Sequence, residues 1–359
     1  MITNYTYKYR IYPNELQKIQ LAKTFGSCRF VFNHYLELSK DNNYQSKTKN
    51  NNNCNRELKL EYPFLKEVDK FSITNSIYNL DNSFKRFFHK LSNYPKFKSK
   101  RNIQSYQTNY TNNNIEVLDN IIKLPKVGKI KAKVHRELIG RIINATVIKY
   151  PTNKYYVCVL VEKEIEEKKE VNKIIGIDMG LSSFITDNNG NKIKDPASLS
   201  YLEYKLSKEQ QKLSLKKKGS NNYHKQRIKV ARVHERINNI RNDFLNQISS
   251  KIINENQIIV VEDLSIKNML KNHKLAKRLN DVSISSFISK LEYKSKWYGR
   301  IFIKVNKYFA STQICHVCGY KNKSLKDLSI RIYTCPICHM EHDRDINAAI
   351  NILEEGIFN

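Results

Sequence analysis

Four cysteines near the C-terminus place the tightest constraint on how this chain can fold. Cys315 and Cys318 form one CxxC pair and Cys335 and Cys338 form a second. A CxxC turn presents two thiolates to one tetrahedral ion, and two such turns complete a four-thiolate site. The pattern therefore predicts a structural zinc ribbon over residues 311–341, with no position left open on the ion for catalysis.

Histidines and acids lie within and directly behind this cysteine pattern. His316, His339 and His342 could compete as zinc ligands. Because four thiolates already close the site, we expect these histidines to be surface side chains or to lie near a substrate. The run Asp343-Arg344-Asp345 has no such structural explanation. We hypothesise that one of its aspartates belongs to an active site whose other members lie upstream.

Two short apolar segments each end in a carboxylate. Ile174 to Ile177 precedes Asp178, and Gln257 to Val261 precedes Glu262. Continuous apolar runs are typical of buried parallel strands, whose ends can lie side by side. Asp178 alone could be an ordinary turn aspartate, but two such ends together favour a site. The glycines flanking Asp178 are interpreted as room for a phosphodiester backbone.

Three carboxylates are predicted to meet: Asp178, Glu262 and one aspartate of the 343–345 run. Mg²⁺ and Mn²⁺ prefer oxygen ligands of this kind. Two such ions about 4 Å apart activate water and stabilise the leaving oxygen in phosphodiester hydrolysis. The order strand-Asp, strand-Glu, helix-Asp indicates a ribonuclease H-like arrangement.

The charge of the chain indicates a polyanionic partner. It has 63 Lys and Arg against 34 Asp and Glu, a formal net charge of +29, and 22 tyrosines. Basic side chains release counterions from phosphates, and aromatic rings stack on bases. A solvated basic surface is the alternative. The candidate nucleic-acid contacts are Lys96, Lys98, Lys100 and Arg101 in a basic and aromatic segment, and Lys225, Arg227, Arg232 and Arg236 on the outer face of a helix.

The sequence also carries expectations about location. No apolar run reaches the length of a membrane span, and the first residues do not resemble a signal peptide. We therefore expect a cytoplasmic, nucleoid-associated bacterial protein with no membrane partner. The remaining cysteines, Cys28, Cys54 and Cys158, are expected to be incidental or small buried side chains.

The N-terminal part is predicted to combine a sheet with helices. Thr3–Tyr12 is a predicted strand, and Asn14 with Gln17 forms a capping box that begins a helix. That helix is expected to end at Gly26, and a second one to cover Cys28–Leu38.

Further along, Lys40–Glu57 is predicted to be a solvated loop because it is rich in Asn and Lys. The apolar spacing from Ile73 to Leu91 predicts a core helix. Short strands are then expected at 115–118, 121–124, 129–134, 142–150 and 155–162. With the first strand they would form a small antiparallel barrel or sheet, into which the helices are inserted.

The C-terminal part follows a charged linker, Glu162 to Lys173. Tyr201–Lys218 and Asn222–Asn254 are predicted as two long helices, the second with one apolar face for a sheet and one basic face. Ser283–Tyr298 is a predicted helix, and Arg300–Val305 a strand leading into the ribbon.

Several stretches resemble the OrfB/TnpB proteins of insertion sequences, compact RNA-guided nucleases related to type V CRISPR effectors. They are 7–13 (YKYRIYP), 176–180 (GIDMG), 234–249, 260–264 (VVEDL) and the CxxC…CxxC tail with DRDINAA. The resemblance implies an α+β multidomain chain with a first β-barrel strand at 1–13, a helical recognition lobe at 14–105 and the rest of the barrel at 106–170. A RuvC-like nuclease domain would follow at 171–359, interrupted by the zinc ribbon.

The same resemblance implies an RNA-guided DNA endonuclease whose partners are a transposon-derived guide RNA and double-stranded target DNA, acting as a monomer or weak dimer. Asp178 and Glu262 match the first two catalytic acids. Asp345 is preferred to Asp343 as the third, because Asp345-Ile346-Asn347 fits the Asp-x-Asn pattern of related effectors. The alternatives are a transposase that works without RNA, and a non-catalytic nucleic-acid-binding regulator.

Overall fold

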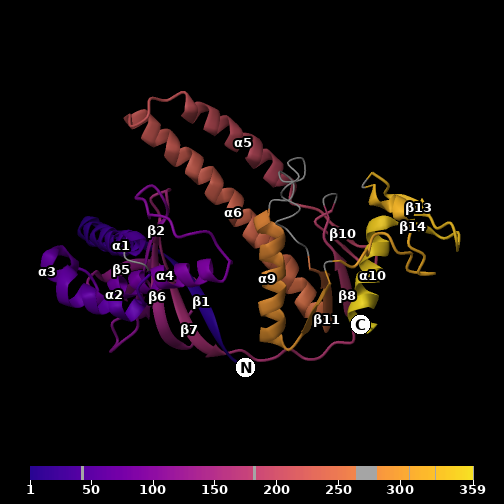
Figure 1. Cartoon of the computed structure of the whole chain (residues 1–359), viewed down its shortest axis with the longest axis horizontal. Helices are drawn as coiled ribbons and strands as arrows, with labels where there is room; N and C mark the ends of the chain where they lie inside the picture. Colours follow the sequence, from indigo (N-terminus) through magenta and orange to yellow (C-terminus); the bar gives the residue numbers. More distant parts are fainter. Residues whose placement is uncertain (42–43, 181–182, 264–280, 307, 328, 359) are drawn as a thin grey trace. The chain divides into compact units, whose positions relative to one another are not determined.

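The computed structural model describes residues 1–41, 44–180, 183–263, 281–306, 308–327 and 329–358 (Figure 1). The chain divides into two compact units. The N-terminal unit is Ile2–Glu164, and the C-terminal unit is Ile165–Asn359 together with Met1. No helix in the described ranges is long and apolar enough to cross a bilayer.

A seven-stranded antiparallel sheet forms one half of the N-terminal unit, in the order β2-β6-β7-β1-β5-β4-β3. Its strands are β1 (Ile2–Tyr12), β2 (Gln104–Asn109), β3 (Glu116–Leu118), β4 (Ile121–Leu124), β5 (Gly128–Lys133), β6 (Arg141–Lys149) and β7 (Tyr155–Glu164). The first strand lies at the centre, between β7 and β5, as predicted. The predicted antiparallel barrel or sheet is present as a curled half-barrel, because the ladder of described strands ends at β2 and β3 and does not close.

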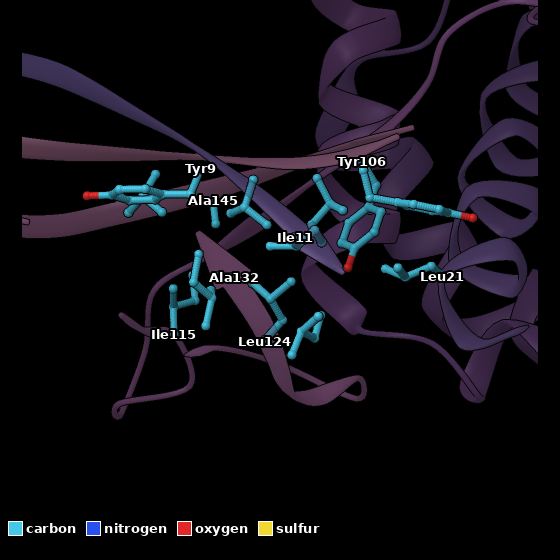
Figure 2. Packing of buried hydrophobic residues seen from close by; sticks show 14 of the residues in the cluster. Tyr9, Ile11, Leu21, Tyr106, Ile115, Leu124, Ala132 and Ala145 are labelled. Atoms are coloured by element: carbon cyan, nitrogen blue, oxygen red, sulfur yellow. The ribbon is translucent and has the colours of Figure 1, made fainter. Parts of the chain in front are cut away.

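The sheet buries one face around Tyr9, Ile11 and the small side chains of Ala132 and Ala145, against Leu21 from the first helix (Figure 2). Successive side chains of β1 alternate between this face and the other, which is why Tyr7, Tyr9 and Ile11 are buried. The pattern explains how a strand so rich in Tyr can lie at the centre of a sheet.

The first helix, α1 (Glu15–Asp41), is a single helix. The predicted capping box is present, since Gln17 N–H donates to Asn14 Oδ1 (2.9 Å) and Asn14 N–H donates to Gln17 Oε1 (3.0 Å). The predicted break at Gly26 is wrong. Glycine in a helix costs only about 1 kcal/mol, whereas α1 buries Leu21 against the sheet and Phe32 against the other helices.

The predicted loop at 40–57 is also wrong for its described residues. They include α2 (Lys47–Asn53) and the start of η1 (Cys54–Leu58), followed by α3 (Lys59–Glu61) and η2 (Pro63–Lys66). Side chains order this polar segment: the Tyr44 hydroxyl and Lys47 N–H donate to Asp81. Asp81 belongs to α4 (Lys70–Phe88), the predicted core helix, whose buried side chains end at Phe84.

A five-stranded sheet organises the C-terminal unit, in the order β10-β9-β8-β11-β12. These strands are β8 (Ile174–Asp178), β9 (Ile185–Asp187), β10 (Lys192–Ile193), β11 (Ile258–Glu262) and β12 (Ile301–Val305). Strands β8 and β11 are parallel, as the apolar runs predicted, and the edge strand β12 is parallel to β11.

Helices cover both faces of this sheet. The second half of α6 (Asn221–Glu255) and α9 (Asp281–Tyr298) pack on one face, and α10 (Arg344–Phe358) packs on the other (Figure 1). The first half of α6 packs on α5 (Ala197–Ser214) through Leu199, Leu202, Val233 and Ile237 instead. Only part of the predicted apolar face of α6 therefore meets the sheet.

Candidate functional site

The pleat of the sheet brings two carboxylates to one face. In β8, Ile175 and Ile177 point into the core formed with α6 and α9, so Asp178 points to the opposite face. In β11, Val260 packs against α10, and Glu262, two residues later, points to the same face of the sheet. The last paired residues are Val261 and Ile177, and Asp178 and Glu262 each come one position later. The two carboxylates are therefore neighbours at the C-terminal edge of parallel strands.

Helix α10 brings the third carboxylate to the same place. A β-carbon on Gly176 would overlap the carbonyl oxygen of Ala349 and lie 2.6 Å from Leu353 Cβ, so the helix lies flush on β8 there. Asp178 is two strand residues beyond Gly176, about 6.6 Å. Asp345 is four helix residues before Ala349, about 6 Å. The charge of Asp345 acts on Asp178, so the start of α10 lies near the end of β8.

The contact with α10 corrects one prediction. Gly176 was interpreted as leaving room for a phosphodiester backbone, but it is buried and the space that its missing side chain leaves is filled by α10. Because Gly176 has no side chain, α10 can pack directly against the backbone of β8.

The charges of Glu262 and Asp345 act on Asp178. Burial, followed by the charges of Glu262 and Asp345, raises the pKa of Asp178 to about 7, and Arg344 opposes the rise. Burial, with the neighbouring Asp263, raises the pKa of Glu262 to about 7. Asp178 is only 8% exposed. Buried like charges are costly unless a cation or a proton joins them, and carboxylate oxygens are the type of ligand that a hard divalent ion prefers.

Asp343 and Asp345 are engaged differently. Asp343 Oδ1 accepts from the backbone N–H groups of Asp345 (3.0 Å) and Ile346 (3.2 Å), which caps α10, and its Oδ2 accepts from Lys192 Nζ at 2.6 Å. The hydrogen bond from Lys192 is the largest of the effects that lower its pKa against burial. Asp345, 13% exposed, pairs with Arg331 at 3.3 Å and adds to the field at Asp178.

The four cysteines come together as predicted. Cys315 Sγ lies 3.6 Å from Cys338 Sγ, Cys318 Sγ lies 3.6 Å from Cys335 Sγ, and all four sulfurs are within 4.8 Å of one another. Four sulfurs about 2.3 Å from one ion would be about 3.8 Å apart, so the cluster fits tetrahedral zinc. Among the described residues, this cluster is the group of potential ligands that meets such a spacing.

Two similar turns build the cluster. Cys315 N–H donates to Tyr320 O and Cys335 N–H donates to Met340 O, both at 2.9 Å. Gly319 and His339 occupy equivalent positions with φ of +74° and +57°. Between the two turns lie η3 (Lys323–Lys326) and β13 (Ile332–Thr334), and the second turn connects β13 to its partner β14 (Glu341–Asp343).

The three histidines are expected to be surface side chains or to lie near a substrate, and His342 is not a surface side chain. His339 is exposed and His316 is half-buried, but His342 is buried, with Nε2 3.1 Å from Cys315 Sγ. Because His342 alternates with Glu341 and Asp343 in β14, its side chain faces inward against Tyr333. Nothing in the sequence indicates that His342 would be buried beside Cys315, because four cysteines already supply all the ligands of a tetrahedral zinc site.

Sequence patterns also missed Arg344, the residue between the two aspartates. Its side chain is buried, and Nη1 donates to Asp327 O at 2.8 Å. Its charge lowers the pKa of Asp178 against the other effects. A short run of charged residues gave no sign that its middle member would be buried.

The predicted basic contacts are mostly exposed. Lys96, Lys100 and Arg101 in the N-terminal unit are exposed, as are Lys225, Arg227, Arg232 and Arg236 along α6. Lys98 differs. Lys98 as a whole is exposed, but its ammonium group lies 4.0 Å from the centre of the Phe32 ring. The partial burial of this group lowers the pKa of Lys98. Its backbone exchanges two hydrogen bonds with Asn33, so Lys98 anchors the segment to α1.

Three family models match the chain. OrfB_IS605, described as "Probable transposase", matches residues 156–273. The TNB domain of Cas12f1-like proteins matches residues 285–352, which include the ribbon and the first half of α10. The helix-turn-helix domain of OrfB_IS605 matches residues 1–48.

Relatives match over nearly the whole chain. A Streptomyces pristinaespiralis protein assigned as an RNA-guided DNA endonuclease is 34% identical, covering 98% of this chain and 89% of the relative. InsQ of Escherichia coli K12, assigned likewise, is 27% identical over 98% of this chain and 92% of its own. The Cas12f1 chain of a cryo-EM complex with sgRNA and target DNA has a similar fold, with a TM-score of 0.61 at 13% identity and 98% coverage of both chains. The chain therefore belongs to the TnpB (OrfB) family.

Proposed function

We propose that this chain is an RNA-guided DNA endonuclease encoded by an insertion sequence. The observation that carries the proposal is the convergence of Asp178, Glu262 and the first turn of α10 at one edge of a parallel sheet. Relatives with this assignment span the chain end to end. In this reading residues 171–359 form a RuvC-like nuclease domain, and the N-terminal unit comprises the barrel half and the helical lobe.

We propose Asp178, Glu262 and Asp345 as the catalytic acids. Bound Mg²⁺ or Mn²⁺ would supply a metal-activated water and charge stabilisation at the phosphate. Asp178 and Glu262 lie at the ends of two paired strands, Asp178 buried and Glu262 half-buried. Asp343 caps the helix that carries Asp345, which supports Asp345 as the third acid.

Partners follow from charge and from the relatives. The exposed basic face of α6 and the exposed Lys96, Lys100 and Arg101 fit the phosphate backbones of guide RNA and target DNA. Base pairing to the guide would then supply sequence specificity. A monomer or weak dimer remains our expectation for the oligomeric state.

The decisive experiment is purification of the protein expressed with its native flanking sequence. We expect a discrete RNA to co-purify, visible as a raised 260/280 nm absorbance ratio and as a defined gel band. The sequenced RNA should direct cleavage of matching DNA. A protein that arrives without RNA and still cuts or joins DNA would instead favour the transposase activity named in the matching family description.

The active site is tested by Asp178→Ala. We expect at least a 10³-fold loss of DNA cleavage with RNA binding unchanged, because the substitution removes a metal ligand and leaves the basic surfaces intact. Glu354→Ala, at an exposed position on α10, is the matched control and should cleave normally. Full cleavage by Asp178→Ala would remove the proposed site, and RNA binding without cleavage in the wild type would favour the non-catalytic regulator.

A further inference from the structure

The first cysteine turn is tied to α10 by two buried asparagines. Asn347 Oδ1 accepts from the backbone N–H (3.1 Å) of His316 and lies 2.9 Å from His316 Nδ1, and Asn347 Nδ2 donates to Ile314 O at 2.7 Å. Asn351 Nδ2 donates to Ser311 O (2.8 Å) and to Ile314 O (2.6 Å). Asn347 is 1% exposed. These bonds hold the residues on both sides of Cys315.

The other side of the ribbon holds the start of the same helix. Arg344 N–H donates to Arg331 O at 2.8 Å, and the Arg344 guanidinium donates to Asp327 O. Arg331 also pairs with the carboxylate of Asp345. The first turn of α10 is therefore held by backbone groups of the segment before β13, at Asp327 and Arg331, and by the first cysteine turn.

The first turn of α10 carries Asp345 on one side and Asn347 on the other. Successive residues are about 100° apart around an α-helix. Asn347 is therefore about 200° from Asp345, so the two side chains leave opposite sides of the helix. Ala348, Ala349 and Ile352, near Asp345 around the helix, are fully buried. One side of α10 thus presents a carboxylate to Asp178 while the opposite side presents amides to the cysteine turn.

We propose that zinc loading of the ribbon positions Asp345 for divalent metal binding, and that Asn347 is the positioning residue that transmits it. The proposal rests on the proposed nuclease site. When the four thiolates are held by one ion, the backbone at Ile314 and His316 is fixed, and Asn347 has its three hydrogen bonds. When that backbone is released, the buried amide loses its partners, and α10 gains freedom to shift at its first turn.

The coupling is reciprocal by thermodynamic necessity. If zinc in the ribbon raises the affinity of the carboxylate site for a divalent ion, occupancy of that site raises zinc affinity by the same factor. Residues that orient metal ligands typically change metal affinity about 10- to 100-fold when removed. A purely structural role for Asn347 would lower stability without a selective effect on this affinity.

The test uses full-length protein that carries zinc, and Mn²⁺ as the probe. Mn²⁺ binding is titrated by electron paramagnetic resonance in wild type, Asn347→Ala and Asp345→Asn, with Glu354→Ala as control. Zinc content by mass spectrometry and the melting temperature are recorded for each. We expect Asn347→Ala to keep one zinc per chain and to weaken Mn²⁺ binding about 10-fold. DNA cleavage should lose kcat with KM unchanged.

A double variant tests the route. If Asn347 acts through Asp345, Asn347→Ala should add little to the loss that Asp345→Asn already causes. Asn351→Ala, which leaves the His316 contacts in place, should give a smaller loss than Asn347→Ala. Additive losses in the double variant would overturn the route through Asp345.

The outcomes separate this inference from the proposed function. If Asp345→Asn weakens Mn²⁺ binding while Asn347→Ala matches the Glu354→Ala control, the positioning role is wrong and the nuclease site stands. If neither Asp345→Asn nor Asp178→Ala changes Mn²⁺ binding, the carboxylate site itself is wrong. Loss of zinc in Asn347→Ala with Mn²⁺ binding equal to the Glu354→Ala control would show that Asn347 serves the ribbon alone and would overturn the positioning role.

Discussion

Gly176 of β8 lies so close beneath Ala349 of α10 that a β-carbon at Gly176 would overlap the Ala349 carbonyl oxygen. This contact fixes α10, the helix that carries Asp345, against the strand that ends at Asp178. Gly356, further along the helix, has a similar relation to Val260 of β11. Two glycines without reactive side chains thus allow α10 to lie close against the sheet.

We predict that Gly176→Ala destabilises the C-terminal unit by about 1–3 kcal/mol, the usual cost of overpacking a core. The obstacle is backbone and a β-carbon, which cannot rotate away. Urea unfolding followed by fluorescence of Trp297, the single tryptophan, reports on this unit. Glu354→Ala is the control in the same unit, because it shortens an exposed side chain on α10. An unchanged midpoint for Gly176→Ala would contradict the close contact.

Asp343 and Asp345 are expected to differ sharply when each is replaced by alanine. Asp345→Ala should lower DNA cleavage at least 10³-fold with little change in stability. Asp343→Ala should cost about 1 kcal/mol of stability because α10 would lose its cap, and it should retain cleavage within about tenfold. Single-turnover cleavage and urea unfolding of both variants check the prediction. The reverse pattern of cleavage would assign the third acid to Asp343.

The raised pKa values predict a pH-dependent stability in buffer without Mg²⁺ or Mn²⁺. Asp178 and Glu262 have pKa values of about 7 when folded, against about 4 in the unfolded chain. The folded state therefore holds protons that the unfolded state has released. This contribution to the free energy of unfolding is full below pH 4 and is lost as pH rises through about 7.

We expect wild type to lose more than about 1 kcal/mol relative to Asp178→Asn between pH 5 and pH 8, since one pKa unit corresponds to about 1.4 kcal/mol. Urea unfolding of both proteins at each pH isolates this difference from other titrating groups. Added Mg²⁺ should reduce the difference at pH 8. Parallel pH profiles for the two proteins would show that Asp178 is not protonated in the folded state.

The basic face of α6 is predicted to bind phosphates. Replacing Arg232 and Arg236 by alanine should weaken RNA or DNA binding and reduce the salt slope of log K by about 0.7–0.9 for each phosphate that is no longer neutralised. Lys98→Ala should leave the slope unchanged, because its ammonium group is held over Phe32. Binding titrations at several salt concentrations measure both. Equal slopes for wild type and the arginine variant would mean that this face is merely solvated.

Local sequence determined the elements and the identity of the chemical groups. The apolar runs before Asp178 and Glu262 predicted β8 and β11 as parallel strands, because only strands buried on both faces have continuous apolar sequence. The CxxC spacing predicted the thiolate cluster, because two residues are enough for one tight turn. The capping box at Asn14 and Gln17 predicted where α1 begins, because both of its bonds are local.

Only the tertiary structure decided what depends on packing between distant segments. Gly26 does not end α1, because side chains on both sides of Gly26 pack into two hydrophobic cores. The other residues of these cores come from distant parts of the chain. Gly176 serves α10 and not a phosphate backbone, and His342 is buried against Cys315. The sequence alone does not distinguish the positions of Asp343 and Asp345. They differ because one lies at the end of a helix, where free N–H groups need a cap, and the other lies within it, facing a buried carboxylate.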